Sequence, residues 1–559
     1  MEVKIHKLGI RREEFSKWER RVSLTPQNCK LLLGKMKGQL IIKIQPSSSR
    51  IYPDCRFEEV GCILDEDITD CDVIIGVKQI PTDKLYKDKT YIFFSHTIKA
   101  QEQNMNMLDD ILQKKIRLID YEKIVNDKNE RLVAFGKFAG NAGAIDILSG
   151  LGSFILNRGI GSPFINISQS YHYQNIEHAK NSIRTIGSHI ESYGLHELIS
   201  PFIVGVTGTG RCAEGALEIL TLLPHEFIEP EELNDLMEES KKFPKKNTKC
   251  IYIVKFTHEH FAELIKPDNK PFDKKHYYEK PELYKGIFQE KYIQYISLLV
   301  NCIYWDDRFP RLITESFLIN KLATDPSYLR LLAISDVTAD FMGSIDFLKK
   351  FTTIDFPFYV FEPETSHIND DFKTAKNGIL YCSIENLPCQ FPLDASNHFG
   401  SELIKFIPDI MRSDITKTLE EQGLPSEIQK AVITYNGSLT NLFTYINKLR
   451  NDTKKNKHNS LQELGEFRRN KFSKIVDIYL TGHLFDTQAI NEILLLLDKK
   501  FNQKCTFVNW DVGKGVKNES SCILTIDENQ TYPDIIKELV PIFEAKGLKF
   551  RIEKKSENN

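Results

Sequence analysis

The sequence of 559 residues contains no apolar run long enough to cross a membrane. Its longest uninterrupted aliphatic run, Ile493–Leu497, is far shorter than the ~20 residues that a spanning helix requires. The first residues, Met1–Lys7, mix charged and apolar side chains, which argues against a secretory signal and against an Arg- and Ser-rich transit peptide. We therefore expect a cytoplasmic protein with no membrane partner.

Excess charge and paired cysteine motifs are also missing. The 74 Lys and Arg residues nearly balance the 77 Asp and Glu residues, so the net charge of −3 gives no reason to expect a nucleic-acid partner. The 11 cysteines are scattered without a C-x-x-C pair, which indicates neither a zinc ribbon nor a disulfide framework and favours a reducing compartment. The H-x-H pair within Thr257–His260 has no other placed ligands, and we expect no metal site.

What the chain does have is the composition of ordinary folded domains, with 41% hydrophobic and 27% charged residues. Up to about residue 135, β-rich runs alternate with helical patterns. One helix is expected to open at Thr25-Pro26, and another to cover Gln101–Lys115. The expected strands are Val3–Ile10, Leu40–Gln45, Val73–Lys78, Tyr91–His96 and Arg117–Tyr121. This alternation predicts a doubly wound parallel sheet.

A second α/β block begins at Pro201. A buried strand is expected at Phe202–Val206, and a tight turn then leads into a helix over Arg211–Leu223. Further strands are expected at His225–Ile228, Ile251–Phe256, Leu298–Ile303 and Leu331–Ile334. We assign residues 141–344 to this second domain, and residues 1–140 together with 345–450 to a discontinuous first domain, with a cleft between the two.

The last part of the sequence predicts a small third domain. Residues 451–471 are strongly polar and are interpreted as a linker, and residues 553–559 as a charged tail. Between them, residues 472–552 show the order β-α-β-β-α-β, which is typical of a ferredoxin-like α+β domain.

Three ionisable residues follow strands of the first predicted sheet. Lys78, His96 and Glu122 each stand where a strand ends. The carboxyl ends of parallel strands share one edge of a sheet, where ligands bind. An ammonium, an imidazole and a carboxylate gathered there could shift one another's pKa values and move protons. Taken one at a time, each residue is also compatible with an ordinary surface position.

Between a strand and a helix of the second domain, Gly208-Thr209-Gly210-Arg211-Cys212-Ala213 matches the dinucleotide fingerprint. Its glycines allow a tight turn and close approach to a pyrophosphate, which the helix N-terminus attracts. Glu229 follows the next strand and could bind a ribose hydroxyl, as in NAD sites, whereas Arg211 could attract the extra phosphate of NADP. The spacing leaves this choice open. The predicted fold class is thus α/β, with two Rossmann-like domains and the ferredoxin-like third.

Seven ordered motifs within about residues 1–450 resemble a known family. They are Glu19–Pro26, Ile75–Lys78, Phe93–Gln101, Val133–Gly136, Asn301–Trp305, Ser335–Asp340 and Ser383–Pro388. They resemble the lysine-ketoglutarate reductase part of bifunctional aminoadipic semialdehyde synthases and, more distantly, lysine-forming saccharopine dehydrogenases and the alanine dehydrogenase and transhydrogenase folds. Gly482–Asp486 resembles the segment that precedes the second enzyme of the plant-type bifunctional proteins.

The resemblance implies a reaction. L-Lysine would condense with 2-oxoglutarate, and a nicotinamide hydride would reduce the imine to saccharopine, the first step of lysine degradation. It favours NADPH over NADH. The glutamate-forming saccharopine dehydrogenase half is expected on a separate protein downstream. The oligomeric state is open, with a homo-oligomer as one alternative.

The resemblance also implies roles for single residues. His96 matches a general acid, Lys78 a general base, and Glu122 a residue that tunes Lys78. The matched substrate-binding residues are Arg21, Lys99, Gln101, Arg131 and Phe135. The matched coenzyme-binding residues are Gly208, Gly210, Arg211, Glu229, Tyr304 and Asp336.

Two alternatives stay open at this point. One is an NAD-dependent enzyme that forms lysine from saccharopine or acts on alanine. The other is an inactive regulatory homologue that binds a ligand through the third domain. Whether Cys212 and Cys302, which follow two strands of the second domain, ever pair is open as well.

Overall fold

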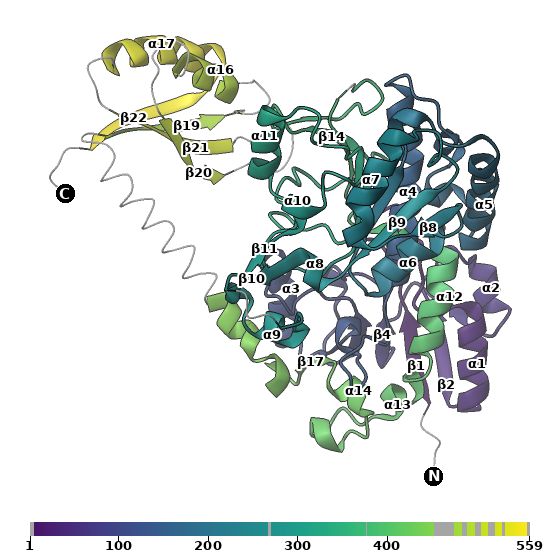
Figure 1. Cartoon of the computed structure of the whole chain (residues 1–559). Coiled ribbons are helices and arrows are strands. Elements are labelled where there is room, and N and C mark those ends of the chain that lie inside the picture. Colours follow the sequence, from purple (N-terminus) through teal and green to yellow (C-terminus); the bar gives the residue numbers. More distant parts are fainter. Residues whose placement is uncertain are drawn as a thin grey trace. The chain divides into compact units, whose positions relative to one another are not determined.

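The computed structural model describes residues 5–266, 270–375, 377–451, 475–482, 484, 489–497, 505–511, 520–527 and 532–555. The chain divides into two compact units, residues 1–446 and 447–559, each of which is described by itself (Figure 1). Apart from Asn451, the predicted linker lies outside the described residues, as does most of the Gly482–Asp486 motif.

The first sheet of unit 1 has eight strands in the order β18-β17-β6-β5-β4-β1-β2-β3. The strands are β1 (His6–Ile10), β2 (Leu40–Ile44), β3 (Ile63–Leu64), β4 (Val73–Ile75), β5 (Thr90–Phe93), β6 (Arg117–Asp120), β17 (Val432–Tyr435) and β18 (Ser438–Leu439). Strands β1 to β6 are parallel, which agrees with the predicted parallel sheet, although β3 is not among the expected strands. Strand β17 pairs antiparallel with β6, and β18 pairs antiparallel with β17.

Helices from both ends of unit 1 pack around this sheet. They are α1 (Pro26–Met36), α2 (Asp54–Glu58), α3 (Glu102–Gln113), α12 (Pro392–Leu403), α13 (Ile407–Arg412) and α14 (Ser426–Gln429). The predicted start at Thr25-Pro26 holds because Thr25 Oγ1 accepts the N–H of Asn28 at 3.3 Å while Asn28 Oδ1 accepts the N–H of Thr25 at 2.9 Å.

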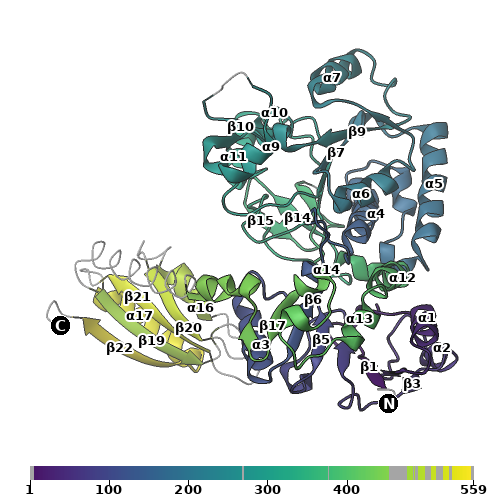
Figure 2. The ribbon, with the colours of Figure 1, turned by 90° about the horizontal axis from the view of Figure 1, so that it is seen from below.

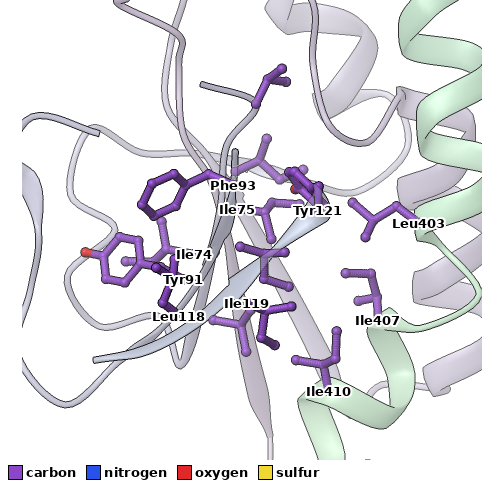
Figure 3. Packing of buried hydrophobic residues seen from close by; sticks show 14 of the residues in the cluster. Ile74, Ile75, Tyr91, Phe93, Leu118, Ile119, Tyr121, Leu403, Ile407 and Ile410 are labelled. Atoms are coloured by element: carbon purple, nitrogen blue, oxygen red, sulfur yellow. The ribbon is translucent and has the colours of Figure 1, made fainter. Parts of the chain in front are cut away.

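The first core forms where apolar side chains of β4, β5 and β6 meet the helices that follow residue 391 (Figure 3). Ile75 and Ile119 are fully buried, and so are Leu403 and Ile407 from α12 and α13. Helices 270 or more residues downstream of β6 therefore complete the core of the N-terminal sheet.

The second sheet also has eight strands, in the order β15-β14-β16-β13-β12-β7-β9-β8. The strands are β7 (Phe202–Thr207), β8 (His225–Phe227), β9 (Ile251–Phe256), β12 (Leu298–Asn301), β13 (Ala333–Asp336), β14 (Tyr359–Glu362), β15 (His367–Asn369) and β16 (Ile379–Cys382). Its helices are α5 (Ile176–Tyr193), α6 (Arg211–Leu220), α7 (Leu233–Lys242) and α11 (Glu315–Thr324). A small excursion contains α8 (His258–Phe261), β10 (Ala262–Leu264), α9 (Lys274–Glu279), β11 (Tyr284–Gly286) and α10 (Phe288–Lys291).

The predicted return to the first domain at residue 345 is wrong. Strands β14, β15 and β16 still belong to the second sheet, and Tyr359 and Tyr381 are fully buried in its core. The chain rejoins the first core only in α12, through Ala395 and Phe399. The short strands after residue 345 were not recognised in the sequence, because polar loops separate them.

Helix α4 (Gly136–Leu156) links the two halves of unit 1. By length and composition it is the one helix among the described residues that could span a membrane, but 78% of its most apolar window is buried in the protein. It lies beside α6 (Figures 1 and 2). The crossing is so close that a Cβ on Gly140 would lie 1.9 Å from the Cys212 carbonyl oxygen, and one on Gly215 would lie 2.0 Å from that of Lys137.

Unit 2 contains one antiparallel sheet in the order β20-β21-β19-β22. Its elements are β19 (Ile475–Gly482), α16 (Ala489–Leu495), β20 (Cys505–Asp511), β21 (Ser520–Asp527), α17 (Tyr532–Ala545) and β22 (Lys549–Lys555). This is the β-α-β-β-α-β order expected from the sequence, although β22 continues into residues assigned to the tail. Apolar residues of β19, such as Ile478, share a core with Leu539 of α17.

Candidate active site

Four loops meet at the carboxyl edge of the first sheet, because β6, β5, β4 and β1 are parallel neighbours. Residues 11–21 follow β1, and Lys78 follows β4. His96 follows β5, and Glu122 follows β6 in a short 3-10 turn, Tyr121–Lys123. The placement of all three residues at one edge agrees with the sequence-based expectation.

The Lys78 ammonium lies over the ring of Phe15, with Nζ 5.0 Å from the ring centroid. Burial lowers the pKa of Lys78, and the positive charge of Arg21 lowers it further, while the carboxylate of Glu19 acts in the opposite direction. A lowered pKa favours the neutral amine, the form that can accept a proton.

His96 lies on a tightly constrained turn. Its backbone is left-handed, with φ of 51°, a conformation uncommon for a non-glycine residue. The imidazole stacks on Phe94 at a centroid distance of 6.3 Å, and Asn104 Nδ2 donates to the His96 carbonyl at 3.0 Å. Burial lowers the pKa of His96, and the charge of Lys78 lowers it further, whereas Glu122 raises it.

A buried polar network fixes this turn. The Ser95 N–H and hydroxyl both donate to Asp120 Oδ2, the backbone contact being 2.9 Å, and Ser95 Oγ also lies 2.8 Å from Thr97 Oγ1. Burial raises the pKa of Asp120 to about 6. The ends of β5 and β6 are thereby held together next to His96.

Glu122 forms an ion pair with Arg131, with Oε1 and Nη2 3.3 Å apart. The resemblance implied that Glu122 tunes Lys78. In the structure the charge of Glu122 raises the pKa of His96, and the largest charge effects on the pKa of Lys78 come from Arg21 and Glu19. Arg131 is 51% exposed and presents an accessible cation at this edge.

Arg21 is buried against partners of its own. Its Nε and Nη2 donate to the two oxygens of Glu19 at 2.7 and 2.5 Å, and the guanidinium lies 4.2 Å from the centroid of Phe135. Asn386, from the segment before α12, donates to Glu19 and accepts from Arg21, at 3.0 and 3.2 Å. Phe135 itself stacks on Phe399 at 4.6 Å. Arg21 and Phe135 are therefore packed inside the protein at this edge of the sheet and do not form an open surface.

The predicted dinucleotide turn connects β7 to α6. Gly208 has a φ of 89°, and a Cβ there would lie 3.0 Å from the Cys302 carbonyl oxygen. A Cβ on Gly210 would meet nothing within 4 Å, which leaves open space in front of the N-terminus of α6. Ala213 is buried against the sheet. The three positions thus supply a tight turn, close backbone approach and helix packing, so the turn fits a dinucleotide pyrophosphate.

Comparisons with known proteins match both halves of this site. The family model described as the N-terminal domain of alanine dehydrogenase/PNT matches residues 9–142. The chain is 39% identical to the alpha-aminoadipic semialdehyde synthase of Arabidopsis thaliana over 88% of its own length and 46% of the relative, and 38% identical to the mitochondrial protein of that name from Mus musculus over 79% and 48%. It spans about half the length of these curated relatives.

The chain is thus similar to alpha-aminoadipic semialdehyde synthases over most of its own length and about half of theirs. The resemblance drawn from the seven motifs is thereby confirmed. A more distant relative, at 24% identity over 70% of this chain and 89% of the relative, is the saccharopine dehydrogenase [NAD(+), L-lysine-forming] of Emericella nidulans.

Glu229 lies one strand further from the dinucleotide turn than the sequence predicts. Strand β9 runs between β7 and β8, so Glu229 is displaced from β7 by two strand spacings, about 10 Å. Its backbone N–H is capped by Glu232 Oε2 at 2.9 Å. Arg211, in contrast, is the exposed first residue of α6.

Asp336 and Tyr304, the other two matched coenzyme residues, differ in exposure. Asp336 is buried, and each of its carboxylate oxygens accepts a hydrogen bond at 2.8 Å, one from Asn301 Nδ2 and one from the Tyr381 hydroxyl. Burial raises its pKa to about 6. Tyr304 is 62% exposed and donates to Asp306 at 3.1 Å. Only Tyr304 offers its side chain to a ligand.

The remaining predicted residues have clear positions. Lys99 and Gln101 are exposed on the loop between His96 and α3. Within the described part of the chain no group of three or more His, Cys, Asp or Glu side chains could hold a metal, and His258 and His260 bond to Tyr278 and Thr257 instead. Cys212 and Cys302 are free thiols.

Two carboxylates at this site, the partly buried Glu13 and the buried Glu19, are not predicted from the sequence. Both lie in residues 11–21, a segment with eight charged residues, and this composition is typical of an exposed surface. The E-x-R spacing of Glu19 and Arg21, within a matched motif, is the only local signal that could have identified one of them.

Proposed function

We propose that the chain is a lysine–2-oxoglutarate reductase, which condenses L-lysine with 2-oxoglutarate and reduces the product to saccharopine with NADPH. The observation that carries this proposal is the pair Lys78 and His96, a lysine with a lowered pKa and a histidine on neighbouring loops at the carboxyl edge of the first sheet. The names of the relatives, which refer to aminoadipic semialdehyde and saccharopine, support the substrate class.

The condensation requires two proton movements that these residues suit. The ε-ammonium of lysine must lose a proton before its nitrogen can attack the keto carbon, and neutral Lys78 accepts that proton. The resulting carbinolamine must lose its hydroxyl as water, and protonated His96 supplies the proton that makes water the leaving group. The C=N double bond forms as the C–O bond breaks.

The anionic substrate finds accessible cations beside these groups. Arg131 is half exposed, and Lys99 is exposed on the His96 loop. A planar guanidinium binds a carboxylate through two parallel hydrogen bonds, which would orient the dicarboxylate. Arg21 is less accessible to a substrate, because it is buried and its Nε and Nη2 already donate to Glu19 and Asn386.

The coenzyme would be held by Gly208, Gly210 and Arg211 at the N-terminus of α6, with Tyr304 nearby on the loop after β12. When bound, a nicotinamide coenzyme supplies the hydride for the reduction. Arg211 at the mouth of the turn, together with the displacement of Glu229 by one strand, supports NADPH over NADH.

Coenzyme oxidation by the purified chain tests the proposal. Oxidation of NADPH should require both lysine and 2-oxoglutarate and should be slower with NADH at equal concentration. Oxidation with pyruvate and ammonia, or turnover only of saccharopine with NAD⁺, would replace the proposal with one of the two dehydrogenase alternatives. Coenzyme binding without any turnover would point to an inactive homologue. A cytoplasmic location forms part of the proposal and is tested by cell fractionation.

A further inference from the structure

The backbone that carries Lys78 is held by a carboxylate from another loop. Glu13 follows β1, and its two oxygens accept two consecutive backbone N–H groups, Oε1 that of Val77 at 2.7 Å and Oε2 that of Lys78 at 3.0 Å. Glu13 is partly exposed as a residue, but its carboxylate is withdrawn from water, and burial raises its pKa to about 7.

The neighbouring polar backbone groups of Gly76 and Val77 also have hydrogen-bond partners. Gly76 donates its N–H to the Ile92 carbonyl at 3.1 Å, and its own carbonyl accepts from the Tyr121 hydroxyl at 2.9 Å. The Val77 carbonyl accepts the N–H of Phe94 at 3.0 Å. The backbone N–H groups of Val77 and Lys78 lie beyond the end of β4 and outside its ladder. Glu13 accepts a hydrogen bond from each of them, so neither is left without a partner.

We call the Glu13 carboxylate and the two N–H groups that it accepts the clamp, and close packing leaves it little room to move. A Cβ on Gly76 would come within 3.3 Å of Glu13 Oε1 and of the Arg11 side chain, so the loop and the carboxylate are in tight contact. Through the Val77 carbonyl and the Phe94 N–H, the same segment is tied to the strand that leads into His96.

We propose that Glu13 is a positioning residue, which sets the place of the Lys78 amine by holding the Val77 and Lys78 backbone N–H groups. The assignment rests on the proposed function for Lys78, since Glu13 acts through that residue and not on the substrate. A displacement of about 1 Å in a reacting group can cost on the order of a hundredfold in rate. A carboxylate can accept both N–H groups, whereas a carboxamide accepts one and turns its NH₂ against the other.

The variant Glu13→Gln tests this assignment, with Glu14→Gln as its matched control. Glu14 lies next in the chain and pairs with Arg11 at 2.6 Å, on the exposed side of the loop. In Glu13→Gln, kcat should fall about tenfold or more, with KM for lysine and 2-oxoglutarate within about twofold of the parent, whereas Glu14→Gln should keep its activity. An unchanged kcat in Glu13→Gln would overturn the proposal.

A double-mutant cycle separates positioning from a general loss of structure. In the Lys78→Met background, Glu13→Gln should change the residual rate by less than about twofold, because the group it positions is gone. If the rate losses of the two single variants multiply in the double variant, Glu13 does not act through Lys78 and the proposal is wrong.

Two readouts do not depend on the activity. After reductive ¹³C-methylation, the Lys78 signal, assigned by its absence in Lys78→Met, should move in Glu13→Gln and stay in place in Glu14→Gln. If Glu13→Gln does not fold, hydrogen exchange of the backbone amides in the parent protein provides the test. We expect slow exchange at Val77 and Lys78. Exchange as fast as in an open loop would show that Glu13 does not hold these N–H groups. A shift of the Lys78 signal in a chain that does not turn over lysine would reject the proposed function while keeping the clamp.

Discussion

Arg21 and Glu19 form a two-point ion pair that is almost completely buried, with side-chain exposures of 2% and 0%. Removing one partner of a buried pair leaves an uncompensated charge, which costs about 3–5 kcal/mol. Glu19→Gln should therefore lower the free energy of unfolding of unit 1 by about that amount, measured by denaturant titration.

A surface pair provides the control for this prediction. Arg12 and Glu66 lie 2.6 Å apart, but Glu66 is 61% exposed. Glu66→Gln should cost less than about 1 kcal/mol. Equal losses in the two variants would show that the Arg21–Glu19 pair is no more important than a surface contact. Added 2-oxoglutarate should stabilise Glu19→Gln more than the parent, because the Arg21 charge then lacks the carboxylate that neutralises it.

The two proton-transfer residues give the second prediction. Lys78→Met and His96→Ala should each lower kcat by about 10²–10⁴, the usual contribution of a positioned acid or base, and leave the Kd for NADPH unchanged. Lys87→Met, at an exposed lysine with 69% side-chain exposure, is the control. If both variants keep most of their NADPH oxidation, the assigned roles are wrong.

A third prediction concerns the pH dependence of stability. The pKa of Glu13 rises from 4.5 to about 7 on folding, so between these values the folded protein binds more protons than the unfolded chain. Stability from this group is therefore fully present below about pH 4.5 and declines as pH rises to about 7, by up to about 3 kcal/mol. The sign is opposite to that of a salt-bridged carboxylate.

The comparison with Glu13→Gln isolates this contribution, because the amide does not titrate. The melting temperature of the parent minus that of Glu13→Gln should be largest near pH 5 and should shrink toward pH 8. A difference that is constant over this range, or that grows with pH, would contradict the raised pKa.

The close crossing of α4 and α6 gives the fourth prediction. In Gly140→Ala, the new Cβ would lie 1.9 Å from a backbone oxygen, so the helices must separate and the dinucleotide turn must move with α6. We expect a loss of about 1–3 kcal/mol in stability and weaker NADPH binding, measured by fluorescence titration.

Gly34→Ala is the matched control for this crossing. Gly34 also lies within a helix, but a Cβ there meets nothing within 4 Å. Since alanine is the better helix former by about 0.5–1 kcal/mol, this variant should be as stable as the parent or slightly more so. Normal coenzyme binding by Gly140→Ala would show that the turn does not depend on the crossing.

Arg211 gives the fifth prediction. If it binds the extra phosphate of NADPH, Arg211→Ala should raise KM for NADPH about tenfold, as expected for the loss of one charged hydrogen bond, and leave KM for NADH nearly unchanged. Equal effects on both coenzymes would place Arg211 at the pyrophosphate instead.

The sequence predicted well those features that depend on strand ends. Lys78, His96 and Glu122 were placed at one edge because each follows a recognisable buried strand. The turn around Gly208 was placed by its glycines for the same reason. In both cases local patterns suffice, since neighbouring parallel strands bring their carboxyl ends together.

What could not be predicted depends on contacts between distant segments. The burial of Glu13 and Glu19 follows from packing against Val77 and Asn386, and a charged segment gives no sign of it. The position of Glu229 depends on strand order, because β9 is inserted beside β7. Asp336 was read as a ligand of the coenzyme, but Asn301 and Tyr381 occupy its carboxylate.

The insertion of one domain into another has a consequence for biosynthesis. Strand β17 pairs with β6, joining Val432 to Ile119, and the intervening residues include the whole second sheet. At ~5–20 residues per second, a ribosome needs on the order of tens of seconds to make that interval. During this time β6 is an edge strand that lacks its β17 partner, and an exposed edge of this kind can pair with other chains. The second sheet, continuous in sequence, can fold first on the ribosome, so the half that bears Lys78 and His96 matures last.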